Sequence, residues 1–196
     1  MTITEFRKPD HPVNPMFIER WSHISFTDEE ISDEQLFSLF EAARWAPSSS
    51  NSQPWCFLYA KRGDANWERF LNLLVEGNRV WAHKAAALLF VLSANTTVHR
   101  DQVLPLRNHS FDTGAAWASF AFQAHLDGWS TRAMGGINLD AIPSALNIPK
   151  DYTVEIGLAV GRPGPIENLP EKLRGREVPN TRRPITEFIA NGNFAW

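Results

Sequence analysis

The sequence lacks the residues of several familiar chemistries. Its single cysteine, Cys56, can form neither an internal disulfide nor a thiolate metal site by itself. Its six histidines never stand in a ligand spacing such as H-x-x-x-H, so we expect no metal site. It also lacks the P-loop motif and the dinucleotide fingerprint G-x-G-x-x-G. His109, Ser110 and Asp112 are triad-type residues, but neighbours on one turn rarely adopt triad geometry, so we do not expect hydrolysis.

Long apolar segments and an excess of positive charge are missing as well. The longest apolar run, 85–92, has eight residues, whereas a helix needs about 20 to cross a bilayer. Residues 1–16 carry charges with no apolar stretch behind them, so we expect no secretory signal, no membrane association and a cytoplasmic protein. With 19 Lys and Arg against 22 Asp and Glu, the net charge is −3, which predicts no nucleic-acid partner.

Aromatic residues are abundant, with eight Trp and 13 Phe in 196 residues. Rings of this size fill cores, and they also serve at interfaces and around flat ligands. The length suits one domain with a full core. We expect a proline-containing N-terminal arm over 1–16, a domain over 17–160, and a proline-rich C-terminal arm over 161–196 that completes the same domain and wraps a partner subunit.

Strand and helix patterns alternate along the chain. A capping box at Ser32–Gln35 predicts a helix over 33–46, and a second helix is expected from Asp64 through Leu74, with Gly77 as its stop. A helix that is apolar nearly all round is expected over 112–127. Strands are predicted over 55–60, 86–92 and 152–160, the second of them covered on both faces. This order predicts a layered α/β or α+β fold with helices on both sides of a sheet.

Two polar segments indicate binding rather than structure alone. Arg20 and Ser22 place a cation and a hydroxyl two residues apart before the first long helix. The segment 46–55 reads A-P-S-S-S-N-S-Q-P-W and lies between the predicted helix and strand. A plain turn needs only two or three such residues, so six polar residues between two prolines predict a binding loop.

These segments resemble elements of the flavin-dependent nitroreductase family. The opening element R-R-S-x-R-x-F of the family is similar to residues 20–26, and its A-P-S-S-x-N-x-Q-P-W element is matched over 46–55. Further similar elements follow in the family's order, at 77–81, 112–116, 134–137 and 182–185. The resemblance covers about residues 17–190 and implies a mostly antiparallel central sheet flanked by helices, in a homodimer with an extended C-terminal arm.

The resemblance also implies a cofactor and the residues that hold it. FMN would lie at the dimer interface, with NADH or NADPH as co-substrate and a nitroaromatic or quinone-like acceptor, by alternate-binding hydride transfer. No catalytic side chain is obligatory, because the flavin carries the chemistry. Arg20, Ser22 and Arg182 would contact the phosphate and ribityl chain, with Arg183 as the neighbouring candidate. The full set of expected cofactor-binding residues is Arg20, Trp21, Ser22, Pro47, Ser48, Ser49, Ser50, Asn51, Gln53, Met134, Gly135, Gly136, Arg182 and Arg183.

Two departures from the family pattern keep other functions open. Ile24 stands where the family has a third basic residue, and the segment 93–107 leaves only a short lid region. A relative that binds FMN without nitroreductase activity, fragments flavin or removes halogen is one alternative. A non-enzymatic dimeric scaffold that binds proteins is the other, and it predicts a colourless protein whose melting temperature does not respond to FMN.

Overall fold

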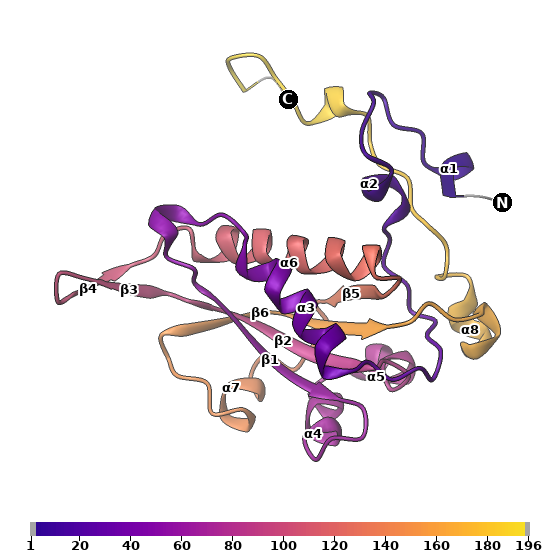
Figure 1. Ribbon diagram of the computed structural model, residues 1–196, viewed down its shortest axis with the longest axis horizontal. Helices are drawn as coiled ribbons and strands as arrows, with labels where there is room; N and C mark the ends of the chain where they lie inside the picture. Colours follow the sequence, from indigo (N-terminus) through magenta and orange to yellow (C-terminus); the bar gives the residue numbers. More distant parts are fainter. Residues whose placement is uncertain (1–2, 195–196) are drawn as a thin grey trace.

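A four-stranded sheet forms the centre of the computed structural model, which describes residues 3–194. Its order is β1 (Trp55–Lys61), β2 (Ala87–Ala94), β6 (Tyr152–Gly161) and β5 (Ser130–Met134), and every neighbouring pair is antiparallel (Figure 1). The strands expected at 55–60, 86–92 and 152–160 are confirmed. The edges of the sheet are therefore β1 and β5, from two distant parts of the chain.

Helices α3 (Asp33–Arg44) and α6 (His109–Leu126) cover one face of the sheet (Figure 1). The predicted capping box begins α3, because the Ser32 hydroxyl accepts from the Gln35 backbone N–H and the Gln35 side chain accepts from the Ser32 N–H. Leu36, Leu39 and Phe120 bury their side chains against the sheet. Burial of such side chains contributes about 1.5–3 kcal/mol each and orients both helices.

Three shorter helices cover the opposite face: α4 (Trp67–Asn72), α5 (Glu76–Ala82) and α7 (Ile142–Ala145). The expectation of one helix ending at Gly77 is wrong, because α4 ends at Asn72 and Gly77 lies inside α5. The chain breaks there because Val75 is extended, and its N–H donates to the Gly136 carbonyl instead of continuing a helix. The expectation of helices on both faces is confirmed.

The segment expected to be a short lid is a β-hairpin. Strands β3 (Thr96–His99) and β4 (Gln102–Pro105) pair antiparallel and extend beyond the sheet at the amino end of α6 (Figure 1). Arg100 and Asp101 form its turn with φ of +48° and +63°. Two left-handed residues match the right-handed twist of the paired strands, so this turn closes a two-residue hairpin without glycine.

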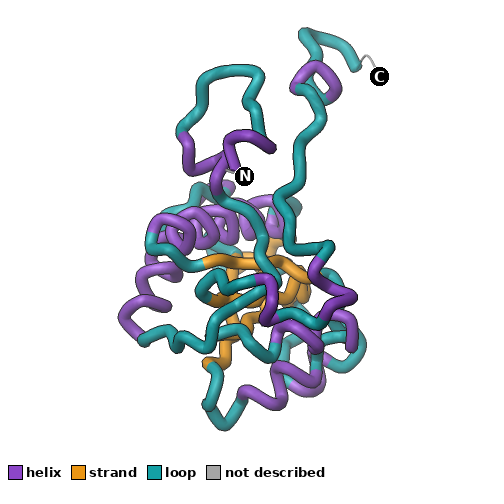
Figure 2. Tube along the Cα trace, turned by 90° about the vertical axis from the view of Figure 1, so that its right-hand side faces the viewer, coloured by secondary structure: helices purple, strands orange, loops and turns teal. Residues whose placement is uncertain are grey.

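The two chain ends leave the same side of the sheet body (Figures 1 and 2). The N-terminal arm contains α1 (Ile3–Phe6) and α2 (Pro15–Glu19), and the C-terminal segment contains α8 (Glu171–Arg174) and short 3₁₀ turns. The arms are joined where the Asp10 carboxylate accepts from the Ile185 backbone N–H at 3.2 Å. No helix within residues 3–194 has the length and hydropathy that a bilayer crossing requires.

The first part of the C-terminal segment is integral to the body. Phe26 forms a β-bridge with Pro163, and Leu169 and Leu173 belong to the buried core. A Cβ added at Gly161 would lie 2.6 Å from the Phe26 ring, so glycine is what allows this close crossing. The part after α8 extends away from the sheet body, alongside the N-terminal arm (Figure 1).

Candidate functional site

Residues 20–22 run beside the edge strand β5. Arg20 caps the end of α2 in an extended conformation and directs the chain along the sheet edge. The Ser130 hydroxyl donates to the Trp21 carbonyl at 3.3 Å, and the Arg132 guanidinium donates to the Ser22 carbonyl at 2.6 Å. Arg20 Nη1 approaches the Ser22 hydroxyl at 3.5 Å. The predicted cation and hydroxyl therefore share one place on the sheet edge.

Three arginines converge at this place. Burial and the positive charge of Arg182 lower the pKa of Arg20, and burial followed by Arg182 and Arg20 lowers the pKa of Arg7. Among the side chains that the structure describes, which exclude those of Thr4 and Glu5 in α1, no carboxylate forms an ion pair with any of the three. Two half-buried guanidinium groups and an exposed one, with no counter-ion among these side chains, are suited to a bound anion such as phosphate. Arg7 was missed by sequence reasoning because it is distant in sequence from both motifs.

The other predicted tail arginine has a different environment. The Arg183 guanidinium lies over the Phe188 ring, 5.4 Å from its centroid, whereas Arg182 Nη1 donates to the Thr181 carbonyl at 2.9 Å. Both line a cavity of about 860 Å³ between the two arms. The charge of Arg182 lowers the pKa of Arg20, and Arg183 is not among the causes of this shift. We therefore assign Arg182, rather than Arg183, to the arginine cluster.

The carboxyl end of β5 provides an open backbone surface. Met134 is buried, while a Cβ added at Gly135 would meet no described atom within 4 Å. A Cβ at Gly136 would lie 2.6 Å from Asn78 Nδ2, which donates to the Gly136 carbonyl at 2.9 Å. Gly136 is therefore required by packing against α5, and Gly135 leaves free space beside the strand end. A planar ring can approach the backbone there.

Arg132 links the arginine cluster to this strand end. It lies on β5, two residues before Met134, and its guanidinium is over the Trp81 ring, 5.8 Å from the centroid. Burial and the neighbouring Arg176 lower its pKa, although Glu177 opposes this shift. Ile24, which stands at the family's basic position, is fully buried in the core. Arg132 is thus a cation close to the segment in which Ile24 provides none, and its hydrogen bond to the Ser22 carbonyl reveals this position.

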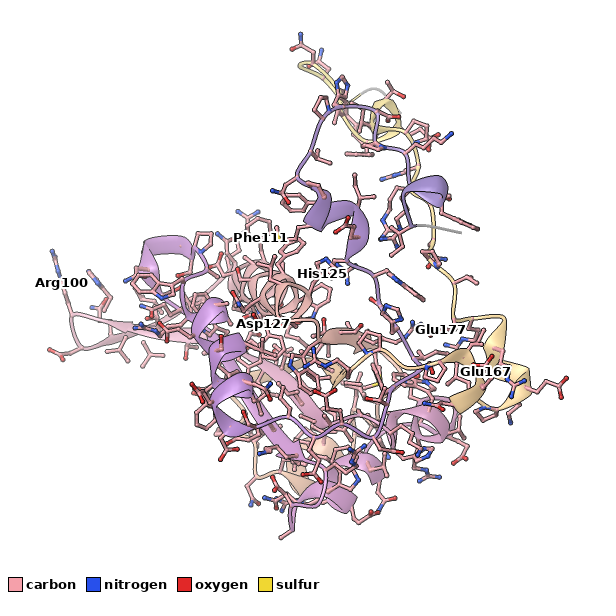
Figure 3. All side chains as sticks on the ribbon, turned by 45° about the vertical axis from the view of Figure 1, so that its right-hand side comes forward. Arg100, Phe111, His125, Asp127, Glu167 and Glu177 are labelled. Carbon is pink, nitrogen blue, oxygen red and sulfur yellow. The ribbon has the colours of Figure 1, made fainter. Side chains whose placement is uncertain are left out.

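Trp21 and its neighbours line a second cavity, next to Arg20. The Trp21 and His23 rings contact each other at an interplanar angle of 43° with centroids 3.7 Å apart, and His23 Nδ1 lies 2.7 Å from Glu177 Oε1. Glu177, labelled in Figure 3, also accepts from the Ile24 backbone N–H at 2.8 Å. Trp21, His23 and His125 line a cavity of about 550 Å³ beneath α2. The loop after α8 thereby fixes the course of residues 21–25.

The predicted polar loop, 47–53, is rigid and strained. Ser50, Asn51 and Gln53 have φ of +52°, +54° and +47°. Left-handed backbone in residues other than glycine is uncommon and concentrates at functional sites. The Ser48 hydroxyl accepts from the Gln53 N–H at 3.0 Å, and the Ser49 N–H donates to the buried Asp112 carboxylate at 2.9 Å.

One chain does not bring the polar loop to the arginine cluster. The loop contacts Asp112 in the first turn of α6, whereas the charge of Arg20 acts on His125 in the last turn. These turns are about 20 Å apart at 1.5 Å per residue. The loop also leads into β1, while residues 20–22 follow β5 at the opposite edge of the sheet. The expected residues therefore form two groups, with Arg20, Ser22, Arg182 and 134–136 in one and 47–53 in the other.

The structure shows no hydrolytic triad around His109. The Ser93 and Ser110 hydroxyls donate to Glu155 Oε1 at 2.5 and 2.6 Å and lie 2.7 and 3.3 Å from His109 Nδ1. Both serines and the carboxylate thus share one imidazole nitrogen, whereas a triad needs the carboxylate and the nucleophile on opposite nitrogens of the ring. Asp112 accepts instead from the Ser49 backbone N–H. Burial raises the pKa of the Cys56 thiol, which keeps it protonated and a poor nucleophile.

Comparison with known proteins agrees with this architecture. The model of the Nitroreductase family matches residues 18–162. A solved structure described as "the oxidoreductase containing FMN" is 43% identical, with a TM-score of 0.94 and 96% of each chain covered. A nitroreductase family protein from Streptococcus pneumoniae has the same fold at 15% identity, with a TM-score of 0.70 over 88% of this chain and 96% of its own.

Curated relatives point the same way. One from Streptomyces coelicolor, named "Putative NADH dehydrogenase/NAD(P)H nitroreductase", is 26% identical over 177 residues, which are 81% of this chain and 89% of that protein. Two others with this description, from Rhodopseudomonas palustris and S. coelicolor, are 28% and 35% identical, and the chain spans about half of their length. Because the family model covers most of the chain and the antiparallel sheet matches solved members, the chain belongs to the nitroreductase family.

Proposed function

We propose that this protein is an FMN-dependent NAD(P)H oxidoreductase of nitroreductase type. The observation that carries the proposal is the arginine cluster of Arg7, Arg20 and Arg182, which is joined through backbone carbonyls and has no counter-ion among the described side chains. Residues 21 and 22 beside it contact the edge strand β5, which ends in open space at Gly135. FMN, which the 43% identical oxidoreductase is described as containing, combines a phosphate with a planar ring and so suits both features. FMN, when bound, accepts and donates the hydride.

The chain's own residues bind and orient this cofactor. Arg20 and Arg182 would donate charge-assisted hydrogen bonds to the phosphate, and the Ser22 hydroxyl would add a directed donor. The space beside Gly135 would admit the ring next to the backbone N–H groups of 135–136. Arg132, which donates to the Ser22 carbonyl from β5, would add positive charge to the same surface. No residue is required to transfer a proton to start the reaction.

The substrates follow from the same open surface. NADH or NADPH and a nitroaromatic or quinone-like acceptor would bind alternately against the face of the FMN ring that the chain leaves uncovered. The curated relatives' names, which include NADH dehydrogenase and NAD(P)H nitroreductase, support the reductant. The absence of a G-x-G-x-x-G segment fits a nicotinamide that docks on the cofactor rather than in a dedicated dinucleotide fold.

A second copy of the chain would complete the site. The loop 47–53 and the arginine cluster lie at opposite ends of α6, so a two-fold partner can bring its loop to the first copy's strand end. The outer side of α6 is apolar and open: Phe111, labelled in Figure 3, is 83% exposed and Leu126 is 64% exposed. The free C-terminal arm carries Phe188 and Ile189, which are also exposed and suited to wrap the partner.

The absorption spectrum of the purified protein tests this proposal. We expect flavin bands, either as purified or after addition of FMN, bleaching by NADH or NADPH, and recovery of the bands with a nitroaromatic or a quinone. A protein that stays colourless with FMN would contradict flavin binding. Bound flavin that neither nicotinamide reduces would contradict the reductase and favour the relative without this activity, which the buried Ile24 also favours.

A further inference from the structure

Arg7, in the N-terminal arm, lies outside the part of the chain that matches the family model. Its Nη1 donates to the carbonyls of Ile18 and Arg20 at 2.8 and 2.9 Å, and its Nε donates to the Asn180 carbonyl at 2.9 Å. One guanidinium therefore joins three parts of the chain: the start of the N-terminal arm, the end of α2 and the C-terminal arm. Its Nη2 has no partner among the described residues.

The carbonyls that Arg7 holds belong to the backbone that carries the phosphate-binding side chains. Arg20 itself supplies one carbonyl, and Asn180 lies two residues before Arg182. Without Arg7, the C-terminal arm would still be joined to the N-terminal arm by the hydrogen bond from the Ile185 N–H to Asp10, but this contact follows Arg182 in the sequence. Because Arg20 and residues 175–182 lie outside helices and strands, these contacts of Arg7 restrict the separation of the Arg20 and Arg182 guanidinium groups.

Bringing three like charges together is unfavourable unless an anion joins them. Arg7 and Arg182 both line the cavity of about 860 Å³ between the arms, and the charges of Arg20 and Arg182 both act on Arg7. Hydrogen bonds to a charged group are worth more than neutral ones, and a cluster of arginines suits the several oxygens of a phosphate. The energy of such contacts offsets the mutual repulsion once the anion is bound.

We propose that Arg7 is a positioning residue of the phosphate site: it holds the two arms so that Arg20 and Arg182 face one phosphate, and it adds a third positive charge. This inference rests on the proposed binding of FMN. It makes the N-terminal arm part of the cofactor site rather than a dispensable extension. It also predicts that a change at Arg7 affects the affinity for the phosphate part of the ligand and not for the ring.

The test compares FMN with riboflavin, which has the same ring without the phosphate. Arg7→Gln is expected to weaken FMN binding about ten- to a hundredfold, measured by quenching of flavin fluorescence, while riboflavin affinity changes less than about twofold. Lys8→Gln is the matched control, because it removes one exposed positive charge that lines the same cavity and leaves the Arg7 contacts to the three carbonyls in place. Arg7→Lys keeps the charge but not the fork, so an intermediate loss is expected.

Each outcome decides the inference. Equal FMN affinity in Arg7→Gln and Lys8→Gln would overturn it, as would an equal loss for FMN and riboflavin, since that is the result of structural damage alone. If Arg7→Gln does not fold, Arg7→Lys decides instead, by the loss of FMN affinity relative to the loss of riboflavin affinity. If the wild-type protein binds neither flavin, the proposed function fails separately. Inorganic phosphate must then raise the melting temperature of Lys8→Gln more than that of Arg7→Lys, relative to chloride at equal ionic strength, or the inference fails too.

Discussion

Gly135 and Gly136 are adjacent, yet the structure gives them different roles. Gly136 packs against Asn78 and Val75, so a methyl group there would displace these two side chains and disturb the Asn78 hydrogen bond to the Gly136 carbonyl. Gly135 has open space where its Cβ would be. The sequence shows only two glycines after a predicted strand, and it cannot distinguish a glycine needed for packing from one needed for ligand access.

Gly135→Ala is expected to leave the melting temperature nearly unchanged and to weaken FMN binding about tenfold or more, because its methyl group occupies the proposed ring space. Thermal unfolding and flavin titration measure the two effects. Gly77→Ala, which also meets no atom within 4 Å but lies in α5, serves as the control and is expected to keep FMN affinity. Unchanged FMN affinity in Gly135→Ala would show that the ring does not bind at the end of β5.

His125 gives a pH dependence of folding stability. Burial is the main cause that lowers its pKa, Arg20 and His23 add to this, and Glu19 opposes it. The unfolded chain therefore takes up the proton at a higher pH than the folded one, so this histidine makes the free energy of unfolding fall as the pH drops below about 6.5. Above that pH its contribution is fully present.

His125→Gln should flatten the decline of stability between about pH 7 and pH 5.5, measured by urea unfolding at several pH values. His99→Gln, in the exposed hairpin, is the matched control and should keep the wild-type slope. A slope in His125→Gln as steep as in the wild type would show that other groups cause the decline. The charges of Glu19, Arg20 and His23 around the imidazole are unchanged in both variants.

At the scale of elements, local signals predicted what local interactions determine. The capping box at Ser32 and the apolar run of β2 lie within a few residues of sequence, and both elements formed as expected. The break between α4 and α5 depends on the Val75 contact to Gly136, 61 residues away, so no local pattern could show it. The hairpin turn at Arg100 and Asp101 lacks the asparagine and glycine that usually announce such turns.

In the candidate site, too, residues marked by local sequence were predicted, and residues placed by contacts distant in sequence were not. The residues 47–53 were predicted because their polar composition is itself unusual, and the structure adds strained backbone there. Arg7 and Arg132 were missed, and Asn78 lay in the recognised element 77–81 without a predicted role, because each joins the site through contacts between segments far apart in sequence. Whether the predicted set binds FMN as proposed rests on the experiments above.

The polar loop depends on α6 for its shape. The Asp112 carboxylate is buried and accepts from the Ser49 N–H, and it lies in the first turn of α6, where negative charge is favourable. Asp112→Ala would leave that N–H without its acceptor and cost about 1–3 kcal/mol of stability. The loop would also lose its anchor.

In a dimer that shares its sites, Asp112→Ala should therefore weaken FMN binding although Asp112 itself touches no ligand. Flavin titration and chemical unfolding measure both effects in one preparation. Asp112→Asn keeps an acceptor oxygen for the Ser49 N–H and is expected to recover most of both losses. Full FMN affinity in Asp112→Ala would show that the polar loop takes no part in the site.

For the whole molecule, the decisive feature is the separation of the two groups of site residues by the length of α6. A monomer with this structure has an arginine cluster and a strained loop that cannot hold one ligand together. Its α6 also presents an apolar outer side, next to which the Phe17 and Phe122 rings already pack edge to face at 5.0 Å. Association along α6 would cover this side and unite the groups.

Oligomeric state and cofactor retention should therefore change together. Phe111→Glu combined with Leu126→Glu is expected to weaken the dimer at least about tenfold, and to release FMN at protein concentrations where the wild type keeps it, because a charged side chain is costly in a covered apolar face. Sedimentation velocity with flavin absorbance follows both quantities. Leu139→Glu, at a 53% exposed position before α7 on the opposite side of the sheet, is the control. A double variant that is monomeric and still binds FMN with wild-type affinity would show that one chain forms the complete site.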